Sequence, residues 1–423
     1  MAAVTIAQGT TWAISAIAAG GVIGRPWRLP EAVWAVLGAV TLVALALVPW
    51  RDALRAVGRG TDVYLFLTGM MLLAELARQE GVFDWLAALS AQQARGSARR
   101  LFALVFAVGT VVTVVLSNDA TAVVLTPAVY AAARAAAAEP LPYLLVCAFI
   151  ANAASFVLPI SNPANFVVFS GQMPPLSSWL AQFAVPSILS IGATYAVLRL
   201  SQRASLRRPI VCRVAVPVLS SAGRLTLWAI GLAAAILIAG SAFGFRLGLL
   251  TAIAGLLTAF IVLLSRRQAP WALLKDISWS VLPLVAGLFV LVEGLTRTGV
   301  TQQLGGALRT AAEHAPSAAS WAAAGITAVA CNLMNNLPVG LVAGSAAVAA
   351  GPLPSPVTGA LLIGVDLGPN LSVTGSLATI LWLVALRREG LDIGAWRFLR
   401  IGTIVTPPAL VLALAGLLAV HLG

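Results

Sequence analysis

The sequence predicts an all-α polytopic membrane protein made of two inverted repeats, each with five crossing helices (one broken) plus a re-entrant helical hairpin. The chain of 423 residues is 60% hydrophobic and only 9% charged. It contains about ten stretches of roughly 18 or more mostly apolar residues, the length that crosses a bilayer. Short motifs recur in the same order in both halves, and the arginines gather in the loops between apolar stretches. Together these observations are typical of a transporter built by duplication.

The chain begins with an uncharged stretch, and its first charged side chain is Arg25. A cleavable signal peptide needs a basic segment before its apolar core. We therefore expect this stretch to be retained as the first membrane helix.

Two segments of the chain share glycine and glutamate at matching positions, at a shift of 218 residues. They are GMMLLAELARQEGV (Gly69–Val82) and GLFVLVEGLTRTGV (Gly287–Val300). The same shift relates Asn118 to Asn336, each of which follows a second polar residue. Chance could produce one such match, but a series in constant order indicates an internal repeat.

Farther along the chain, LPISNPANF (Leu158–Phe166) aligns with LSVTGSLAT (Leu371–Thr379) at a shift of 213. This alignment pairs Ser161 with Thr374, Asn162 with Gly375 and Pro163 with Ser376. The change in shift corresponds to a loop that is five residues shorter in the second half.

The repeat divides the chain into a first membrane half (1–200), a basic linker (201–223) and a second membrane half (224–423). Each half should contain three helices, a hairpin, a broken helix and a closing helix. The predicted hairpins are Arg100–Arg134 and Ser317–Ala350, and the predicted broken helices are Leu141–Gly171 and Pro356–Leu386. Two amphipathic segments, Phe83–Arg95 and Gln302–Ala315, are expected to lie along the membrane surfaces.

The distribution of arginine orients the chain, because cytoplasmic loops are enriched in basic residues. The densest basic cluster is Arg199, Arg203, Arg207, Arg208, Arg213 and Arg224. We therefore expect a multi-pass protein of the cell (inner) membrane with its central loop in the cytoplasm. Basic residues flank the first hairpin but not the second, which predicts that the two hairpins open to opposite sides. The stretch Arg51–Asp62, with three arginines on the outer side, does not follow this pattern.

The composition excludes several other classes of protein. The single lysine, Lys275, is followed by aspartate, so the chain contains no Walker A phosphate loop. Its two histidines, His314 and His421, lie near predicted helix ends and form no metal or triad motif. We therefore expect a secondary transporter rather than an enzyme, with no cofactor and no metal. The net charge of +12 reflects loop arginines rather than nucleic-acid binding.

Two aspartates interrupt apolar segments. Asp119 belongs to SNDAT at the expected tip of the first hairpin, and Asp366 belongs to GVDLGPNLSVTGS, in which glycine and proline break the helix. An aspartate near the bilayer centre costs about 2.5–3.5 kcal/mol, so it usually faces a polar cavity and serves a function. The alternative is that each carboxylate only caps a half-helix.

Two glutamates, Glu75 and Glu293, occupy equivalent positions in the repeats. They are further candidates for proton coupling. Because they lie near helix ends, an ion pair with Arg78 or Arg297 is the favoured interpretation.

The two hairpin tips and the two broken helices should meet at one central site, because unwound backbone within a membrane must line protein or water. This site would offer amide and hydroxyl groups from Asn118, Thr121, Asn162, Asn165, Asn336, Asn370, Ser372, Thr374 and Ser376. It contains no arginine or lysine. A small neutral polyhydroxyl solute or a cation therefore fits better than a dianion, although helix N-termini could bind an organic anion.

Four segments resemble the ArsB arsenical pump membrane proteins of the ion transporter superfamily: SNDATAVVLTP, NNLPVG, GMMLLAELARQEGVFDWLA and GVDLGPNLSVTGSLATILWL. The resemblance spans essentially the whole chain. It implies export of trivalent arsenic or antimony, with As(OH)3 exchanged for protons by alternating access. An arsenite-stimulated ATPase subunit, which associates with some members, would be a partner.

Combining the predicted site with this resemblance, our hypothesis is that Asn118, Asn336, Ser372 and Thr374 hold As(OH)3, while Asp119 or Asp366 binds the proton. We expect Asp366 to be the principal proton carrier. The first tip, Ser-Asn-Asp, differs from the Ser-Asn-Thr of sodium-coupled dicarboxylate members, and the second tip is Asn-Asn-Leu, which disfavours a sodium site. A sodium/proton antiporter or a sodium-coupled anion transporter of the same superfamily is the alternative.

Overall fold

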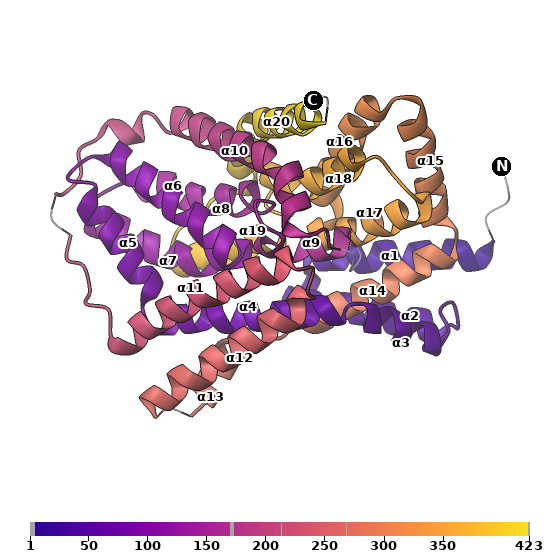
Figure 1. The fold of residues 1–423 in the computed structure, drawn as a ribbon, viewed down its shortest axis with the longest axis horizontal. Helices are drawn as coiled ribbons and strands as arrows, with labels where there is room; N and C mark the ends of the chain where they lie inside the picture. The colour runs from indigo at the N-terminus through magenta and orange to yellow at the C-terminus, as the bar shows by residue number, and fades with distance from the viewer. Residues whose placement is uncertain (1–4, 170–172, 213, 268, 422–423) are drawn as a thin grey trace.

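The computed structural model describes residues 5–169, 173–212, 214–267 and 269–421. Within these ranges the regular elements are helices, apart from an isolated bridge between Ser97 and Pro209 (Figure 1). The predicted all-α class is confirmed. Seven of the described helices are long and apolar enough to cross a membrane, or up to nine if each bent pair forms one span. This is fewer than the predicted crossings because some apolar helices are short: α2 (Glu31–Ala44) has 14 residues.

The elements of the first half follow one another closely. They are α1 (Ile6–Gly24), η1 (Pro26–Arg28), α2, α3 (Trp50–Arg59), α4 (Thr61–Gln79), α5 (Val82–Gln93), α6 (Ala98–Val115), the π-helix η2 (Ala120–Leu125), α7 (Thr126–Ala135), α8 (Leu141–Ala153), η3 (Pro159–Ser161), α9 (Pro163–Val168) and α10 (Leu176–Ser201). The end of the first broken helix, predicted at Gly171, lies outside the described residues.

The second half repeats this order after the linker, which holds η4 (Ser205–Arg207). Its elements are α11 (Ser221–Ala242), α12 (Leu247–Arg266), α13 (Trp271–Asp276), α14 (Val281–Arg297), α15 (Val300–His314), α16 (Pro316–Met334), α17 (Asn336–Ala350), α18 (Ser355–Leu367), η5 (Gly368–Leu371), α19 (Leu377–Arg388) and α20 (Ala395–Val420). Helices α3 and α13, which the sequence did not predict, precede α4 and α14 at equivalent positions.

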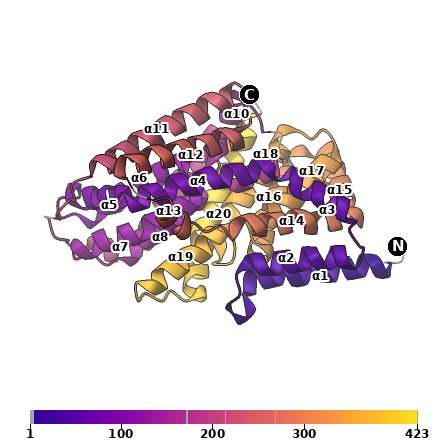
Figure 2. The ribbon, with the colours of Figure 1, turned by 90° about the horizontal axis from the view of Figure 1, so that it is seen from below.

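Contacts between the halves are reciprocal. Helix α4 packs along α12, and its counterpart α14 packs along α2, while α10 and α20 pack against each other. The two hairpin regions, α5–α7 and α15–α17, lie at opposite ends of the long axis (Figures 1 and 2). This exchange of equivalent contacts is the pattern of a pseudo-two-fold axis. The inversion of the two halves across a membrane stays a prediction.

The repeated glycines explain two of these close contacts. A Cβ atom built on Gly69 of α4 would overlap the backbone of Thr251 on α12. A Cβ on the equivalent Gly287 of α14 would lie 2.7 Å from the backbone carbonyl of Ala35 on α2. Small residues let membrane helices approach closely, so this glycine pair permits the two reciprocal helix crossings.

The predicted surface segments are the short helices α5 and α15. Each begins after a glycine in the left-handed conformation, Gly81 with φ 71° and Gly299 with φ 87°. Glycine adopts this conformation without a steric penalty. The same turn therefore redirects the chain at both ends of the molecule.

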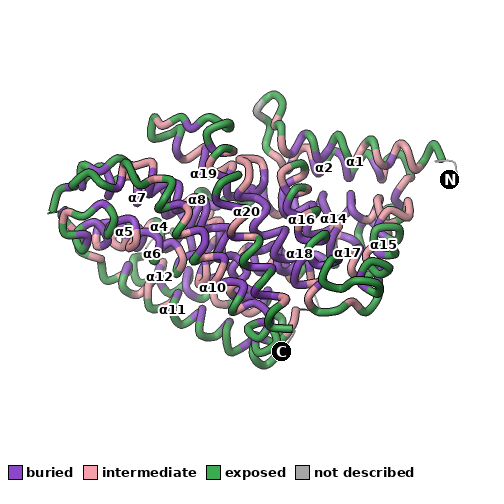
Figure 3. The backbone as a smooth tube through the Cα atoms, turned by 90° about the horizontal axis from the view of Figure 1, so that it is seen from above, coloured by how far each residue is buried: buried purple, intermediate pink, exposed green. Residues whose placement is uncertain are grey.

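Buried residues concentrate in the middle of the molecule (Figure 3). Every residue of α8 from Pro142 to Ala153 is buried. By contrast, α11 and α12 expose large apolar side chains, among them Trp228 and Phe260. The exposed apolar surface is what lipid requires, whereas the buried centre contains the broken helices.

Candidate functional site

A narrow cavity lies in this buried centre, where η2, α9, α17 and α19 begin. Its lining residues are Leu67, Asn118, Asp119, Asn162, Pro163, Val281, Asn336, Leu337, Ser376, Leu377 and Ala378. The cavity therefore combines both hairpin tips with the second segments of both broken helices. Its volume of about 10 Å³ is enough for roughly one water molecule.

Polar side chains at these helix starts satisfy backbone N–H groups. The Oδ1 atom of Asn162 accepts a hydrogen bond from the N–H of Ala164 (2.9 Å), and the Ser376 hydroxyl accepts one from the N–H of Thr379 (3.1 Å). At the first tip, the Asn118 side chain accepts from the N–H of Asp119 (2.9 Å). Helix N-termini carry partial positive charge, so the cavity attracts electron-rich oxygen atoms.

The second tip is shaped by Asn335, which the sequence analysis did not select. Helix α16 ends at Asn335, whose backbone has a φ of 75°. Its side chain accepts a hydrogen bond from the N–H of Leu337 at 3.4 Å. Asparagine is among the non-glycine residues that most often adopt a positive φ. The Asn-Asn pair at this tip thus places one residue in the turn and the other, Asn336, in the cavity.

The two predicted aspartates occupy different environments. Asp119 is half-buried and lines the cavity. Asp366, at the end of α18, is fully buried and is not a lining residue. Its Oδ1 atom accepts a hydrogen bond from Nδ2 of Asn162 at 2.8 Å, while its Oδ2 atom is buried without a hydrogen-bond partner among the described residues. Asn162 therefore lies between Asp366 and the cavity.

The two aspartates do not occupy equivalent positions in the two halves. Asp366 is the penultimate residue of α18, and the penultimate residue of its counterpart α8 is Asn152. Asn152 donates a hydrogen bond to Oδ1 of Asn370 at 2.9 Å. The residue equivalent to Asp119 is Leu337. Each half therefore contributes one carboxylate, at a position where the other half has a neutral side chain.

Three predicted ligands stabilise the surrounding backbone and do not line the cavity. The Thr121 hydroxyl lies 2.8 Å from the hydroxyl of Thr113. Asn165 donates to the carbonyl of Ser155 at 3.0 Å, within the break of the first broken helix. Asn370 donates to the carbonyl of Phe149 at 3.0 Å. These contacts fix the loops from which the cavity residues project.

Ser372 and Thr374 likewise do not line the cavity. Both bind Asn332 of α16, a residue that was not among the predicted ligands. The Ser372 hydroxyl donates to Oδ1 of Asn332 (2.6 Å), and the Thr374 hydroxyl donates to its backbone carbonyl (3.0 Å). This cluster ties the second hairpin to the break in the second broken helix. In this structure both hydroxyl groups use their donor hydrogens on Asn332.

The repeat supplies a matching contact and corrects one alignment. The Ser161 hydroxyl donates to the carbonyl of Val114 at 3.1 Å, as Thr374 does to the equivalent residue. This contact agrees with the pairing of Ser161 with Thr374. The helix-capping residues, however, are Asn162 and Ser376, which are 214 residues apart. The capping residues thus pair one position beyond the predicted pairings of Asn162 with Gly375 and of Pro163 with Ser376.

Glu75 and Glu293 do not line the cavity and take part in two equivalent ion-pair networks. Glu75 binds Arg78, which also binds Asp276 on α13, at 2.7 Å. In the other network, Glu293 of α14 binds Arg59 of α3. In each case the end of a long helix is joined to the short helix of the other half.

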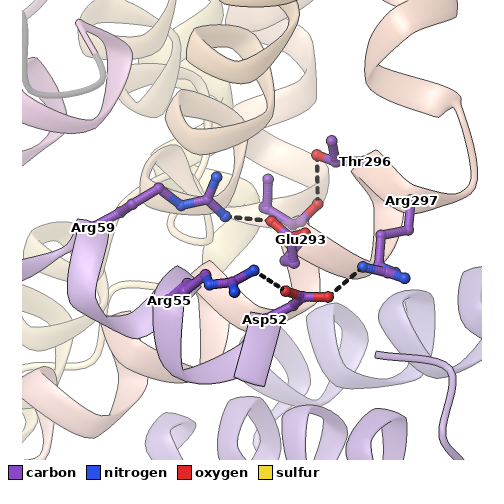
Figure 4. A network of polar contacts seen from close by, with 7 residues as sticks. Asp52, Arg55, Arg59, Glu293, Thr296 and Arg297 are labelled. Carbon is purple, nitrogen blue, oxygen red and sulfur yellow. Dashed lines mark hydrogen bonds and ion pairs between the residues drawn. The ribbon is translucent and has the colours of Figure 1, made fainter. Parts of the chain in front are cut away.

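The second network includes further residues of α3 (Figure 4). Asp52 accepts from Arg55 and from Arg297 of α14, each at 2.7 Å. The favoured interpretation paired Glu293 with Arg297, but the structure pairs Glu293 with Arg59 and Arg297 with Asp52. These pairs also neutralise part of the basic charge of the Arg51–Asp62 stretch that disagreed with the arginine pattern.

We expect Glu293→Gln to leave transport by the protein unchanged. The substitution should lower the free energy of unfolding by at most about 1 kcal/mol, because its partner Arg59 is 61% exposed and solvent screens the pair. Thermal unfolding and vesicle transport of the purified variant would measure both effects. A loss of transport would instead place Glu293 in the transport mechanism.

The fold and the central cavity define a class of protein, the multi-pass α-helical membrane transporter. Residues 15–368 match a family model described as "Citrate transporter", CitMHS, and the chain belongs to this family. The match covers both tips and the first segment of each broken helix.

Curated relatives support the resemblance seen in the sequence. The chain is 28% identical to an arsenical pump membrane protein of Yersinia enterocolitica, with 82% of this chain and 84% of the relative covered. It is 27% identical to the arsenical pump membrane protein of Escherichia coli K12 over the same shares of the two chains. The predicted resemblance to this group is confirmed.

Two solved structures share the fold. The YdaH transporter of Alcanivorax borkumensis aligns with a TM-score of 0.56 and 18% identity, covering 92% of this chain and 97% of that one. MtrF of Neisseria gonorrhoeae, described as an antimetabolite efflux pump, aligns with a TM-score of 0.51 and 13% identity, covering 90% of this chain and 84% of that one. At these identities the likeness concerns the fold.

Proposed function

We propose that this protein exports trivalent arsenic and antimony, as neutral hydroxides such as As(OH)3, in exchange for protons. The observation that carries this proposal is the composition of the cavity. Amide and hydroxyl groups from Asn118, Asn162, Asn336 and Ser376 meet there beside Asp119, with no arginine or lysine in the lining. A neutral molecule with several hydroxyl groups can donate to the amide oxygens and accept from helix N-termini.

Alternating access is part of the proposal, and the size of the cavity supports it. A cavity with room for roughly one water molecule is too small for a molecule with three hydroxyl groups. A hairpin tip must therefore move before the solute enters. Movement of the second tip would also release Ser372 and Thr374 from Asn332, so that their hydroxyl groups could bind the solute.

The proposed exchange uses Asp366 as the principal proton carrier and Asp119 as a carboxylate that faces the solute. A proton from the outer side would bind while arsenic is released, and its departure to the cytoplasm would reset the carrier. The protein would lie in the inner membrane with its basic linker in the cytoplasm and its two halves inverted. An arsenite-stimulated ATPase subunit is the proposed soluble partner.

Inside-out vesicles should take up arsenite when their interior is acidified, without sodium. We expect an uncoupler, which dissipates the proton gradient, to abolish this uptake, because protons leaving the vesicle supply the driving force. Vesicles that lack the protein serve as the control. Uptake that ignores the proton gradient would refute proton exchange.

The second candidate is a sodium/proton antiporter or a sodium-coupled anion transporter. The helix N-termini around the cavity favour the sodium-coupled anion transporter, since they stabilise negative charge. Asp119 opposes it, because a nearby carboxylate repels a dianion. Citrate uptake that requires sodium, measured in the same vesicles, would establish the alternative and exclude arsenite/proton exchange.

A further inference from the structure

We infer that Asn162 is a positioning residue that links the protonation of Asp366 to the cavity and to the start of α9. This inference rests on the proposed function for its role in transport, but the link itself is a property of the two side chains. It differs from a role as a simple solute ligand. The amide of Asn162 is already bound on both sides.

The geometry fixes the orientation of the Asn162 amide. Its Oδ1 atom accepts from the N–H of Ala164 at 2.9 Å, and its Nδ2 atom donates to Asp366 at 2.8 Å. Asn162 is 1% exposed. A rotation of the amide would break the cap of α9 and face Asp366 with an oxygen atom, so neither contact can change independently of the other.

The contact with Asn162 connects Asp366 to the cavity, because Asp366 itself does not line it. The carboxylate belongs to the second half, whereas Asn162 belongs to the first, and only Asn162 of the two lines the cavity. Among the described residues, no arginine, lysine or histidine forms an ion pair with Asp366. Cys331 of α16 is the titratable group that faces it, and Ser155 faces it as a neutral group from the first half.

Protonation of Asp366 would act through this amide. An ionised carboxylate makes the stronger hydrogen bond, and a neutral carboxyl group makes a weaker one. A proton on Asp366 therefore weakens the hydrogen bond that Asp366 accepts from Nδ2 of Asn162. This N–H group can then donate to a hydroxyl oxygen in the cavity. The position of the N-terminus of α9 and of the cavity lining then depends on whether Asp366 carries a proton.

The repeat identifies the substitution that tests this link. Ser376 caps α19 at the position where Asn162 caps α9, so Asn162→Ser retains a capping hydroxyl on a shorter side chain but removes the Nδ2 group that donates to Asp366. Asn165→Ser is the matched control. Asn165 is an equally buried asparagine of the same helix, and its amide donates to backbone carbonyls. Both variants would be made in the full chain and purified in lipid nanodiscs.

The first measurement is the infrared band of the protonated carboxyl group as a function of pH, assigned to Asp366 by its absence in Asp366→Asn. In Asn162→Ser the midpoint should move to higher pH by roughly one unit, because loss of the donor removes a stabilising contact of the ionised form. Asn165→Ser should titrate like the native protein. An unchanged midpoint in Asn162→Ser, or the same shift in the control, would overturn the inference.

If Asn162→Ser does not fold, Asn162→Gly provides the second test. Glycine is accepted at a helix N-cap and has no side-chain donor, so the midpoint should again move to higher pH, and an unchanged midpoint would overturn the inference. Arsenite uptake separates this result from the proposed function. An infrared shift in a protein that does not carry arsenite supports the link and rejects the substrate. A native protein that carries arsenite but shows no shift in Asn162→Ser rejects the link alone.

Discussion

Inside-out vesicles that contain Asp366→Asn should fail to accumulate arsenite under an inwardly acid proton gradient, with uptake at the level of vesicles without the protein. Asparagine has nearly the shape of aspartate but cannot carry a proton. The fold already places an asparagine, Asn152, at the equivalent position of the first half. The loss should therefore reflect coupling, and radioactive or mass-spectrometric arsenic uptake would measure it.

The control for this experiment is Asp84→Asn. Asp84 is an exposed carboxylate in the first turn of α5 and lies outside the cavity lining. Uptake by this variant should equal that of the native protein. If Asp366→Asn retained full uptake, the proton would have to bind elsewhere, and Asp119→Asn would become the decisive variant because Asp119 lines the cavity.

The substitution Gly69→Leu should prevent stable folding of the protein. A side chain at this position would overlap the backbone of Thr251, and helix backbone cannot yield as a flexible side chain can. Forcing α4 away from α12 opens one of the helix crossings that join the halves. We expect a loss of at least about 3 kcal/mol in the free energy of unfolding, measured by thermal unfolding in detergent.

Gly231→Leu is the matched control for this substitution. Gly231 also lies within a membrane-length helix, α11, but a Cβ atom built on it meets nothing within 4 Å. Its variant should elute as a single species and unfold close to the native temperature. Equal behaviour of the two leucine variants would mean that the α4–α12 crossing tolerates separation.

Much of the fold could be predicted because a membrane imposes strong rules on sequence. Apolar length predicted the helices, and the recurrence of Gly69 and Glu75 at Gly287 and Glu293 predicted two equivalent halves. Helix-breaking residues around Asn118, Asn162 and Asn336 predicted a central site, and these three side chains line one cavity. The short helices α3 and α13 were missed because they are too short to produce an apolar segment.

Sequence by itself determined the class of protein, the order of its longer helices and which polar segments are unwound. The tertiary structure decided which of those polar side chains line the cavity and which bind one another. Hydroxyl and amide groups have the same chemistry in both settings, but Ser376 caps α19 and lines the cavity, whereas Ser372 binds Asn332 of α16. The contact of Asp366 with Asn162 is of the same kind, because it joins residues 204 positions apart from different halves. Such partners depend on how the halves pack, which no local pattern specifies.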